Sequence, residues 1–267
     1  MQPIRIGRVL ADDLIEIHAH PRERELFSAS YPGLTTEAGY AGAGALHRHR
    51  LSLGWRPLGR KIGFTNRTIW PRYGIYEPIW GTVYDRTVLF AEADSAALPL
   101  EGLVQPRIEP EICFGLRAAP RPGAALDAIE WVAHSIEIVQ CHHAGWKVTL
   151  ADCAADNGLH GRLIVGTRVA ASGIGQLAER LPKLAVTLRK EGIVVDQGTG
   201  ANVLDSPLLA LEHLVSVLSR QPAAPPLAAG EIVTTGTLTD AHPVRPGETW
   251  STEIAGLPLP GLRVRFQ

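Results

Sequence analysis

Two segments near the amino end repeat their apolar residues every three or four positions, which is the period of an amphipathic helix. They are LADDLIEIHA, residues 10–19, and TTEAGYAGAGALHRHRLSL, residues 35–53. Thr35 or Thr36 is well placed to cap the second helix, since threonine favours the position before the first helical turn. We therefore predict an N-terminal helical segment over residues 1–57.

From residue 58 onward the pattern changes to short apolar runs rich in Val, Ile and Thr, separated by turns that contain Gly and Pro. Runs of this length and composition predict β-strands. The predicted strands are RKIGF, GTVYDRTVLF, EICFGL, SIEIVQ, GRLIVGTRV, KLAVTLRKEGIVV, EIVTTGTLT and GLRVRF. Their number and spacing predict a β-rich domain over residues 58–267 with antiparallel or mixed pairing, so that the fold class is α+β.

Two further helices interrupt the predicted strands. The first is WKVTLADCAADNG, residues 146–158, which ends at its glycine. The second is SPLLALEHLVSVLSR, in which Ser206 can cap the helix and Pro207 occupies the first helical position. The segment QPAAPPLAAG, residues 221–230, is expected to be a surface connection of limited flexibility.

Composition excludes several classes of protein. The 267 residues are 45% hydrophobic and 20% charged, with a formal net charge of −1, and the most basic stretch is the short HRHR at residues 47–50. Nucleic acid and anionic membranes are therefore not expected as partners. The chain shows neither the layout of a signal peptide nor an apolar run of about 20 residues. Its three cysteines, Cys113, Cys141 and Cys153, have no metal-binding spacing, which favours the cytoplasm.

Three glutamates stand out because each lies in an apolar strand. Side chains on a strand alternate faces, so Glu109 and Glu111 of RIEPEICFGL point the same way, and Glu137 is the only charge in SIEIVQ. Pro110 cannot donate a ladder hydrogen bond, which predicts a local edge or bulge. Three carboxylates suit Mg²⁺ or Mn²⁺. The alternative is a set of solvated glutamates on a half-exposed strand.

Several segments together resemble a known family. They are GRKIGFTNRTIWPRYGI, PRIEPEICFGL, SIEIVQ, WKVTLADCAADN, VVDQGTGANVLDSPLLALEHLV and GEIVTTGTLT. Their order and spacing resemble the fumarylacetoacetate hydrolase superfamily, and most closely its 2-keto-4-pentenoate hydratase and 4-oxalocrotonate decarboxylase branch. The resemblance implies a mixed β-roll or barrel core with flanking helices, a homodimer or higher homo-oligomer, and a metal held by Glu109, Glu111 and Glu137.

The same resemblance implies roles for further residues. Lys61 matches the active-site lysine, which is expected to act in catalysis and to bind the substrate carboxylate, while Thr235 and Gly236 match a loop that contacts the acid end of the substrate. The residues that match the helix beside the metal, and that are expected to orient its waters or ligands, are Trp146, Lys147, Asp152, Asp156 and Asn157. Without the resemblance, these residues would be interpreted as a surface lysine, a strand end and a helical face.

The chain departs from the hydratase pattern at two positions. Ile79 stands where the hydratases usually carry an aspartate, and Leu159 stands where they carry a small hydroxyl residue. The neighbouring His160 could supply the missing polar function as a catalytic acid or base, because imidazole titrates near neutral pH. Alternatively, His160 is a structural histidine bonded to the backbone.

These observations predict an enzyme that acts on a small 2-oxo or 2-hydroxydienoic acid. The resemblance implies a lyase that hydrates a 2-hydroxy-2,4-dienoate in aromatic-compound catabolism, or a decarboxylase of a 4-oxalocrotonate-like diacid. Hydrolysis of an acylpyruvate is disfavoured because NRTIWPRYGIYEP lacks the histidine of the hydrolytic lid. A binding protein without catalytic activity is the remaining alternative.

Other catalytic classes find no support in the sequence. The pairs His18/His20, His47/His49 and His142/His143 lack the spacing of zinc ligands, and we predict surface or capping positions for them. No G-x-S-x-G motif of a serine hydrolase occurs. GTGAN, residues 198–202, is predicted to be a turn rather than a dinucleotide-binding loop.

Overall fold

The structure is a computed structural model that describes residues 3–221 and 224–267. Residues 1–2 of the predicted N-terminal segment and residues 222–223 of the predicted connection lie outside the described residues. The helices are α1 Pro3–Ala19, α2 Phe27–Ser30, α3 Thr36–Ser52, α4 Trp70–Tyr73, α5 Leu150–Ala155, α6 Leu177–Arg180 and α7 Pro207–Ser219. The strands are β1 Pro57–Gly63, β2 Ile79–Tyr84, β3 Val88–Phe90, β4 Ser95–Leu98, β5 Arg107–Leu116, β6 Ile129–Val139, β7 His160–Val165, β8 Val169–Ala170, β9 Ala185–Lys190, β10 Ile193–Thr199, β11 Ile232–Thr234, β12 His242–Pro243, β13 Thr249–Ala255 and β14 Arg263–Phe266.

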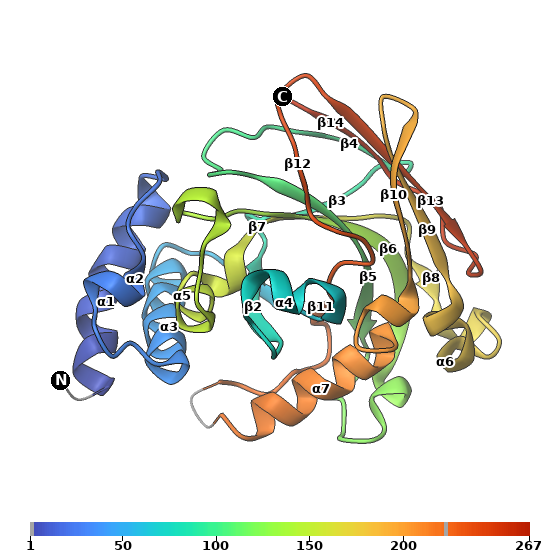
Figure 1. The fold of residues 1–267 in the computed structure, drawn as a ribbon. Helices are drawn as coiled ribbons and strands as arrows, with labels where there is room; N and C mark the ends of the chain where they lie inside the picture. Colours follow the sequence, from blue (N-terminus) through green and yellow to red (C-terminus); the bar gives the residue numbers. More distant parts are fainter. Residues whose placement is uncertain (1–2, 222–223) are drawn as a thin grey trace.

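The strands form two sheets (Figure 1). The larger, nine-stranded sheet has the order β2-β1-β11-β5-β6-β7-β3, with β12 added beside β5 and β8 beside β6. The smaller sheet has the order β10-β9-β13-β14-β4. Pairing is mostly antiparallel, but β1–β11, β3–β7 and β4–β14 are parallel. The larger sheet curls, and helices flank it, which confirms the predicted α+β class with a mixed β-roll core.

The two faces of the larger sheet have different surroundings. Ile136 and Ile138 of β6 pack towards the smaller sheet, in one hydrophobic cluster with Leu188 and Val264. Glu137 lies between these isoleucines and is turned to the opposite face, as strand alternation requires. The acidic side chains therefore face away from the core between the sheets.

The N-terminal helices pack against α5, at the end of the sheets opposite α6 (Figure 1). Leu14 and Leu46 are buried in the same cluster as Ala155 of α5. Gly39 allows close packing, because a Cβ there would lie 2.6 Å from the Ala151 carbonyl oxygen. The division of the chain into residues 1–57 and 58–267 stays a prediction. Among the described residues, no helix has the length and apolar character needed to cross a bilayer.

The helix ends agree with the sequence except in one case. Thr35 caps α3 by accepting from the Ala38 N–H, and Ser206 caps α7, with Pro207 in its first turn. The helix predicted over residues 146–158 is much shorter. It begins only after the capping box of Thr149 with Asp152, and its last turn gives way to left-handed residues.

Several strand predictions need correction. GTVYDRTVLF is two strands, β2 and β3, because a turn closes between them, with the Thr87 N–H donating to the Tyr84 carbonyl. GRLIVGTRV and KLAVTLRKEGIVV likewise divide into two strands each, β7 with β8 and β9 with β10. Strands β4, β12 and β13 were not predicted.

Pro110 lies in an interior strand and not at a bulge. The ladder on its β11 side is nevertheless interrupted, since pairing stops at Cys113 and resumes with β12 only at Ile108.

Candidate active site

Cross-strand pairing brings the three glutamates together. Strands β5 and β6 are antiparallel neighbours, and Glu109 lies directly opposite Glu137, while Glu111 lies opposite Ser135. One carboxylate oxygen from each glutamate lies within 4.8 Å of the others. Glu111 and Glu137 are fully buried and Glu109 is partly exposed. Like charges placed opposite each other destabilise a sheet, so this arrangement requires a compensating positive charge.

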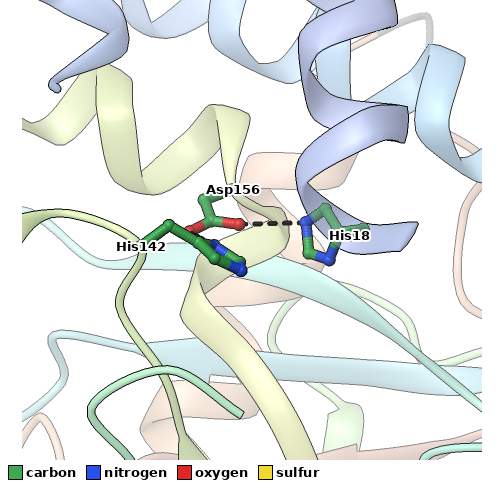
Figure 2. A group of neighbouring side chains, drawn as sticks. All are labelled: His18, His142 and Asp156. Atoms are coloured by element: carbon green, nitrogen blue, oxygen red, sulfur yellow. Dashed lines mark hydrogen bonds and ion pairs between the residues drawn. The ribbon is translucent and has the colours of Figure 1, made fainter. Parts of the chain in front are cut away.

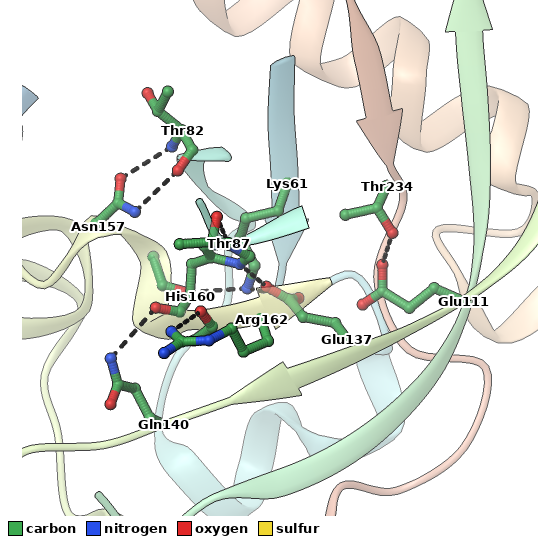
Figure 3. A network of polar contacts seen from close by, with 12 residues as sticks. Lys61, Thr82, Thr87, Glu111, Glu137, Gln140, Asn157, His160, Arg162 and Thr234 are labelled. Carbon is green, nitrogen blue, oxygen red and sulfur yellow. Dashed lines mark hydrogen bonds and ion pairs between the residues drawn. The ribbon is translucent and has the colours of Figure 1, made fainter. Parts of the chain in front are cut away.

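The end of β11 supplies donors to Glu111. The Thr234 hydroxyl donates to Glu111 Oε2 (Figure 3), and the Gly236 N–H donates to the same oxygen at 2.9 Å. Gly236 is required there, because its φ is +100° and a Cβ would lie 1.9 Å from the Thr65 hydroxyl oxygen. Glu111 Oε1, although buried, has no hydrogen-bond partner among the described residues. One oxygen of Glu111 is thus fixed and the other remains free to bind a ligand.

Lys61 partly compensates the acidic cluster. Its ammonium lies 3.2 Å from Glu137 Oε2 and donates to the Gly158 carbonyl oxygen at 2.8 Å. Lys61 is only 1% exposed, so it is not a surface lysine. With all groups ionised, one lysine beside three glutamates leaves two negative charges, which matches a dication.

The pKa values reflect this imbalance. Desolvation raises the pKa of Glu109 to about 7, against the lowering effect of Lys61, and it raises the pKa of Glu111 well above its ordinary value. Burial also acts to raise the pKa of Glu137, but Lys61 and His160 together hold it below its ordinary value. The cluster is therefore hard to keep ionised unless a cation is bound.

His160 lies behind Glu137 (Figure 3). Its Nδ1 lies 2.7 Å from Glu137 Oε1 and its Nε2 lies 2.9 Å from the Thr87 hydroxyl, and the ring is 3% exposed. Burial lowers the pKa of His160, which favours a neutral ring that donates from Nδ1 and accepts at Nε2. Because both nitrogens are engaged, this position favours orienting Glu137 over exchanging protons with a substrate. A catalytic role for His160 stays a prediction.

A small pocket opens beside Lys61 and Glu109. Its wall is mostly apolar and includes both departures from the hydratase pattern, Ile79 and Leu159; the other lining residues are Gly63, Phe64, Ile69, Arg72, Tyr73, Val139, Trp146, Gly158 and Ala241. The pocket volume is about 40 Å³, which is room for a few waters but not for a five-carbon acid.

Three residues that line the pocket have left-handed backbone conformations. Phe64 has φ +55°, Trp146 has φ +59° and Leu159 has φ +63°. Large side chains rarely adopt this region, and strained residues of this kind gather at functional sites. Asn157, with φ +49°, continues the strained stretch and is held by two hydrogen bonds to the backbone of Thr82. This turn aims the Gly158 carbonyl at Lys61.

Some residues expected at the site lie elsewhere. The Thr235 hydroxyl donates to the Ile112 carbonyl oxygen, whereas the neighbouring Thr234 faces Glu111. Strand alternation in TTGT could have indicated Thr234, since it shares a face with Gly236. Lys147 is exposed and does not line the pocket. Asp152 caps α5 and accepts from Ser28 at 2.8 and 2.9 Å.

A second group of possible metal ligands joins α1 to the turn after α5 (Figure 2). Asp156 accepts from His142 Nδ1 at 2.8 Å, and its other oxygen lies 2.9 Å from His18 Nε2. The prediction of surface or capping positions is wrong for His142 and also for His143, which are 0% and 1% exposed. Asp156 is the charged partner of His142 and His18, whereas both ring nitrogens of His143 have no hydrogen-bond partner among the described residues.

The hydrogen bonds of this second group disfavour a metal. Arg50 Nη2 lies 3.1 Å from His18 Nδ1, and because arginine can only donate, His18 carries its proton on Nε2, facing Asp156. A metal on Nε2 would move that proton to Nδ1, against the Arg50 donor. Burial lowers the pKa of His18 to about 4, so the ring stays neutral. The group is best described as a hydrogen-bond network centred on Asp156, in which His142 Nε2 has no hydrogen-bond partner among the described residues.

The glutamate cluster, in contrast, fits a divalent cation. It offers three oxygen donors, the buried Glu111 Oε1 has no hydrogen-bond partner among the described residues, Glu137 Oε2 is paired only with Lys61, and the net charge of the cluster is negative. Oxygen donors and an excess of negative charge suit a hard cation such as Mg²⁺ or Mn²⁺.

Comparison with known proteins gives consistent matches. Residues 77–265 match the family described as fumarylacetoacetate (FAA) hydrolase C-terminal. The chain is 32% identical over 234 residues to the 2-keto-4-pentenoate hydratase of Paraburkholderia xenovorans (strain LB400), covering 85% of this chain and 83% of that protein. It is 31% identical over 213 residues to a 4-oxalocrotonate decarboxylase from Pseudomonas sp., covering 78% of this chain and 79% of the other.

The fold is also similar to solved structures. The 4-oxalocrotonate decarboxylase from Pseudomonas putida G7, complexed with magnesium and adipate, superposes with a TM-score of 0.88 at 24% identity, covering 100% of this chain and 99% of that one. The fumarylpyruvate hydrolase from Pseudomonas aeruginosa, in complex with Mn²⁺ and pyruvate, gives a TM-score of 0.57 at 17% identity, covering 78% and 88%. At these identities the likeness establishes the fold alone.

Proposed function

Because this chain belongs to the fumarylacetoacetate hydrolase family, we propose that it is a divalent-metal-dependent lyase that hydrates a 2-hydroxy-2,4-dienoate. Water addition would convert 2-hydroxypenta-2,4-dienoate, through its 2-oxo-3-enoate tautomer, into 4-hydroxy-2-oxopentanoate. The observation that carries the proposal is the cluster of Glu109, Glu111 and Glu137 at a pocket that Lys61 also lines. The named hydratases among the relatives support this substrate class.

Glu109, Glu111 and Glu137 would hold the cation, with Mg²⁺ or Mn²⁺ as the expected ions. A cation held there supplies Lewis-acid stabilisation of the negative charge that develops on the oxygens of a 2-oxo acid. The Thr234 hydroxyl and the Gly236 N–H fix the Glu111 carboxylate, so their proposed contribution is to hold a ligand in place rather than to contact the substrate.

Lys61 would bind the acid group of the substrate. Its ammonium contacts Glu137 and the Gly158 carbonyl, which leaves its third N–H for an anion in the pocket. Burial favours loss of its proton, but the three glutamates outweigh this effect and raise the pKa of Lys61, so it stays charged. The apolar side chains of Ile79 and Leu159 would surround the carbon chain of the substrate and leave room for only a few waters beside it.

Proton transfer is assigned to ordered water rather than to His160. The ring does not line the pocket, and its two nitrogens are bound to Glu137 and Thr87. Trp146 lines the pocket, with its indole N–H donating to the Gln105 carbonyl at 3.2 Å, so it would shape the pocket wall. Asn157 would hold the turn that carries Gly158.

Decarboxylation of a 4-oxalocrotonate-like diacid is the second candidate. One observation favours it: Arg72 lines the same pocket as the buried Lys61, and its guanidinium pairs with the half-buried Asp240, at 3.1 Å. A second carboxylate on the substrate could replace Asp240 as the partner of Arg72. The decarboxylases among the relatives agree with this reaction. Assembly as a homodimer or higher oligomer and a cytoplasmic location are part of the proposal too.

A product assay tests both reactions. The protein, with Mg²⁺ or Mn²⁺ added, is incubated with 2-hydroxypenta-2,4-dienoate or with 4-oxalocrotonate, and the products are followed by NMR. We expect metal-dependent formation of 4-hydroxy-2-oxopentanoate from the first. Release of CO₂ from 4-oxalocrotonate, without hydration of 2-hydroxypenta-2,4-dienoate, would identify the protein as a decarboxylase. Absence of metal-dependent turnover of either compound would contradict the proposed enzyme class.

A further inference from the structure

A second cavity, much larger than the active-site pocket, lies between α3 and strands β1 and β2. Its volume is about 570 Å³, within the range of small-molecule sites. Its lining includes the acid Glu37, the aromatic residues Tyr40 and Trp80, the arginines Arg48 and Arg60, and Asn157. None of them lines the active-site pocket, and the function proposed above uses only Asn157, as part of the turn before Gly158.

The two cavities lie on opposite faces of β1. Arg60 and Lys61 are successive residues of this strand, so their side chains project to opposite sides. Lys61 lines the active-site pocket and Arg60 lines the second cavity. A single strand thus supplies one buried cation to each cavity.

Arg60 is a buried cation whose hydrogen bonds are incomplete. The residue is 3% exposed, and its Nε has no hydrogen-bond partner among the described residues. Its Nη1 donates to the Gly59 carbonyl at 3.1 Å and reaches Glu231 only at 3.4 Å. A buried guanidinium without full pairing is costly, and a bound anion would remove that cost. Arg48 at the rim adds a second positive charge.

Beside Arg60 two aromatic residues line the cavity. The rings of Tyr40 and Trp80 are stacked on each other, with centroids 5.0 Å apart and planes 14° apart. The pair is fixed, because the Trp80 indole N–H donates to Gln221 and the Trp80 backbone N–H donates to the Tyr40 hydroxyl oxygen. Four residues after Tyr40 on α3, Gly44 leaves open space, since a Cβ there would meet only Arg48, at 3.7 Å. The cavity therefore offers aromatic side chains and room for an apolar body.

We propose that this cavity is a second ligand site, which takes an aromatic or conjugated monocarboxylate. The carboxylate would pair with Arg60, with Arg48 nearby, and the aromatic or conjugated body would contact the Tyr40 and Trp80 pair. The site is distinct from the metal-dependent centre, and its existence does not depend on the reaction catalysed there.

Calorimetric titration of the whole protein with benzoate tests the proposal, in the presence of saturating Mg²⁺ and oxalate to occupy the active site. We expect one benzoate per chain to bind under these conditions. Benzamide, which keeps the ring but lacks the charge, should bind at least ~10-fold more weakly, since a charge-assisted bond is lost. Acetate, which keeps the charge but lacks the ring, should be similarly weak.

Variants locate the binding. Arg60→Gln should weaken benzoate at least ~10-fold. Because loss of a buried arginine could impair folding, Gly44→Leu provides a second test: it fills open space on a helix and should abolish benzoate binding while turnover persists. Arg48→Gln should weaken binding modestly, and Arg263→Gln, which removes an exposed arginine far from the cavity, should leave it unchanged.

Three results would overturn the proposal. One is the absence of saturable benzoate binding, another is its complete loss when Mg²⁺ and oxalate are present, and the third is wild-type binding by Gly44→Leu. If benzoate does not bind and Gly44→Leu instead dissociates an oligomer, the cavity is a contact between copies of the chain.

Discussion

Two groups of three potential metal ligands, about equally compact, differ in what their neighbours leave unsatisfied. In each group, one donor atom per residue lies within 4.8 Å of the others. The glutamate cluster of Glu109, Glu111 and Glu137 retains negative charge and one buried oxygen, Glu111 Oε1, that has no hydrogen-bond partner among the described residues. In the group of His18, His142 and Asp156, one carboxylate lies between two rings, and Arg50 fixes the proton of His18.

This difference teaches that proximity of donor atoms is a poor criterion for a metal site. What matters is the charge and the lone pairs that remain after the protein's own hydrogen bonds are counted. Lys61 satisfies one of the three glutamates and leaves a deficit that a dication can fill. No such deficit remains around Asp156, whose two oxygens each face a histidine nitrogen.

The largest effect is expected from the glutamate cluster. Glu111→Ala should lower metal-dependent turnover by ~10³-fold or more. The substitution removes one of the three carboxylates that would hold the cation, and the cation stabilises the negative charge of the transition state. Steady-state kinetics at saturating Mg²⁺ measure the effect, and Glu109→Ala should behave alike. Full turnover by either variant would remove the basis for assigning the cation to this cluster.

A smaller loss is expected when the residue behind the cluster is changed. His160→Ala removes the ring that holds Glu137, which should weaken metal affinity by ~10–100-fold. Added Mg²⁺ should restore most of the turnover, because the ring orients a ligand and does not contact the substrate. If turnover instead stays low at saturating metal and one limb of the pH–rate profile disappears, His160 acts as an acid or base.

The two groups should give metal-free stability opposite pH dependences. The pKa of Glu109 is raised to about 7 from 4.5, so its stabilising contribution is complete below its ordinary pKa and is lost as pH rises towards 7. The pKa of His18 is lowered to about 4 from 6.5, so its contribution is complete above 6.5 and is lost as pH falls towards 4.

Urea unfolding in EDTA, from about pH 5 to about pH 8, separates these contributions. Glu109→Gln should reduce the loss of stability at rising pH, and His18→Gln should reduce the loss at falling pH. The comparison between the two groups fails if the two variants shift the profile in the same direction.

The smallest effect on catalysis is expected from the histidine group. His18→Gln should lower the free energy of unfolding by about 1–3 kcal/mol, because a buried partner of Asp156 is lost. Turnover at saturating Mg²⁺ should stay within ~3-fold of wild type, since His18 touches neither the pocket nor the glutamates. A loss of turnover as large as that of Glu111→Ala would indicate that the cation binds at the histidine group and not at the glutamate cluster.

Local rules were sufficient for much of this architecture. Period-two alternation puts Glu109 and Glu111 on one face, and capping chemistry identifies the starts of α3 and α7. The same alternation, applied to TTGT, would have favoured Thr234 over Thr235 as the residue that faces Glu111. The metal, substrate and catalytic roles assigned to these residues stay predictions.

Other features depend on tertiary contacts, which local patterns do not contain. The position of Glu137 opposite Glu109 follows from the register of two strands that are joined by a long connection. His18 comes close to His142 because α1 packs against α3, which in turn packs against α5, so spacing along the chain could not pair them. Leu159 is an aliphatic residue with a left-handed backbone conformation, and the conformational propensity of leucine does not predict it.

Direct titration of Mg²⁺ into the metal-free protein tests the central claim, that the glutamate cluster and not the histidine group binds the cation. Isothermal calorimetry should show one cation per chain for the wild type and for His18→Gln, and no saturable binding for Glu111→Gln. Unchanged binding by Glu111→Gln, or its loss in His18→Gln, would contradict the account.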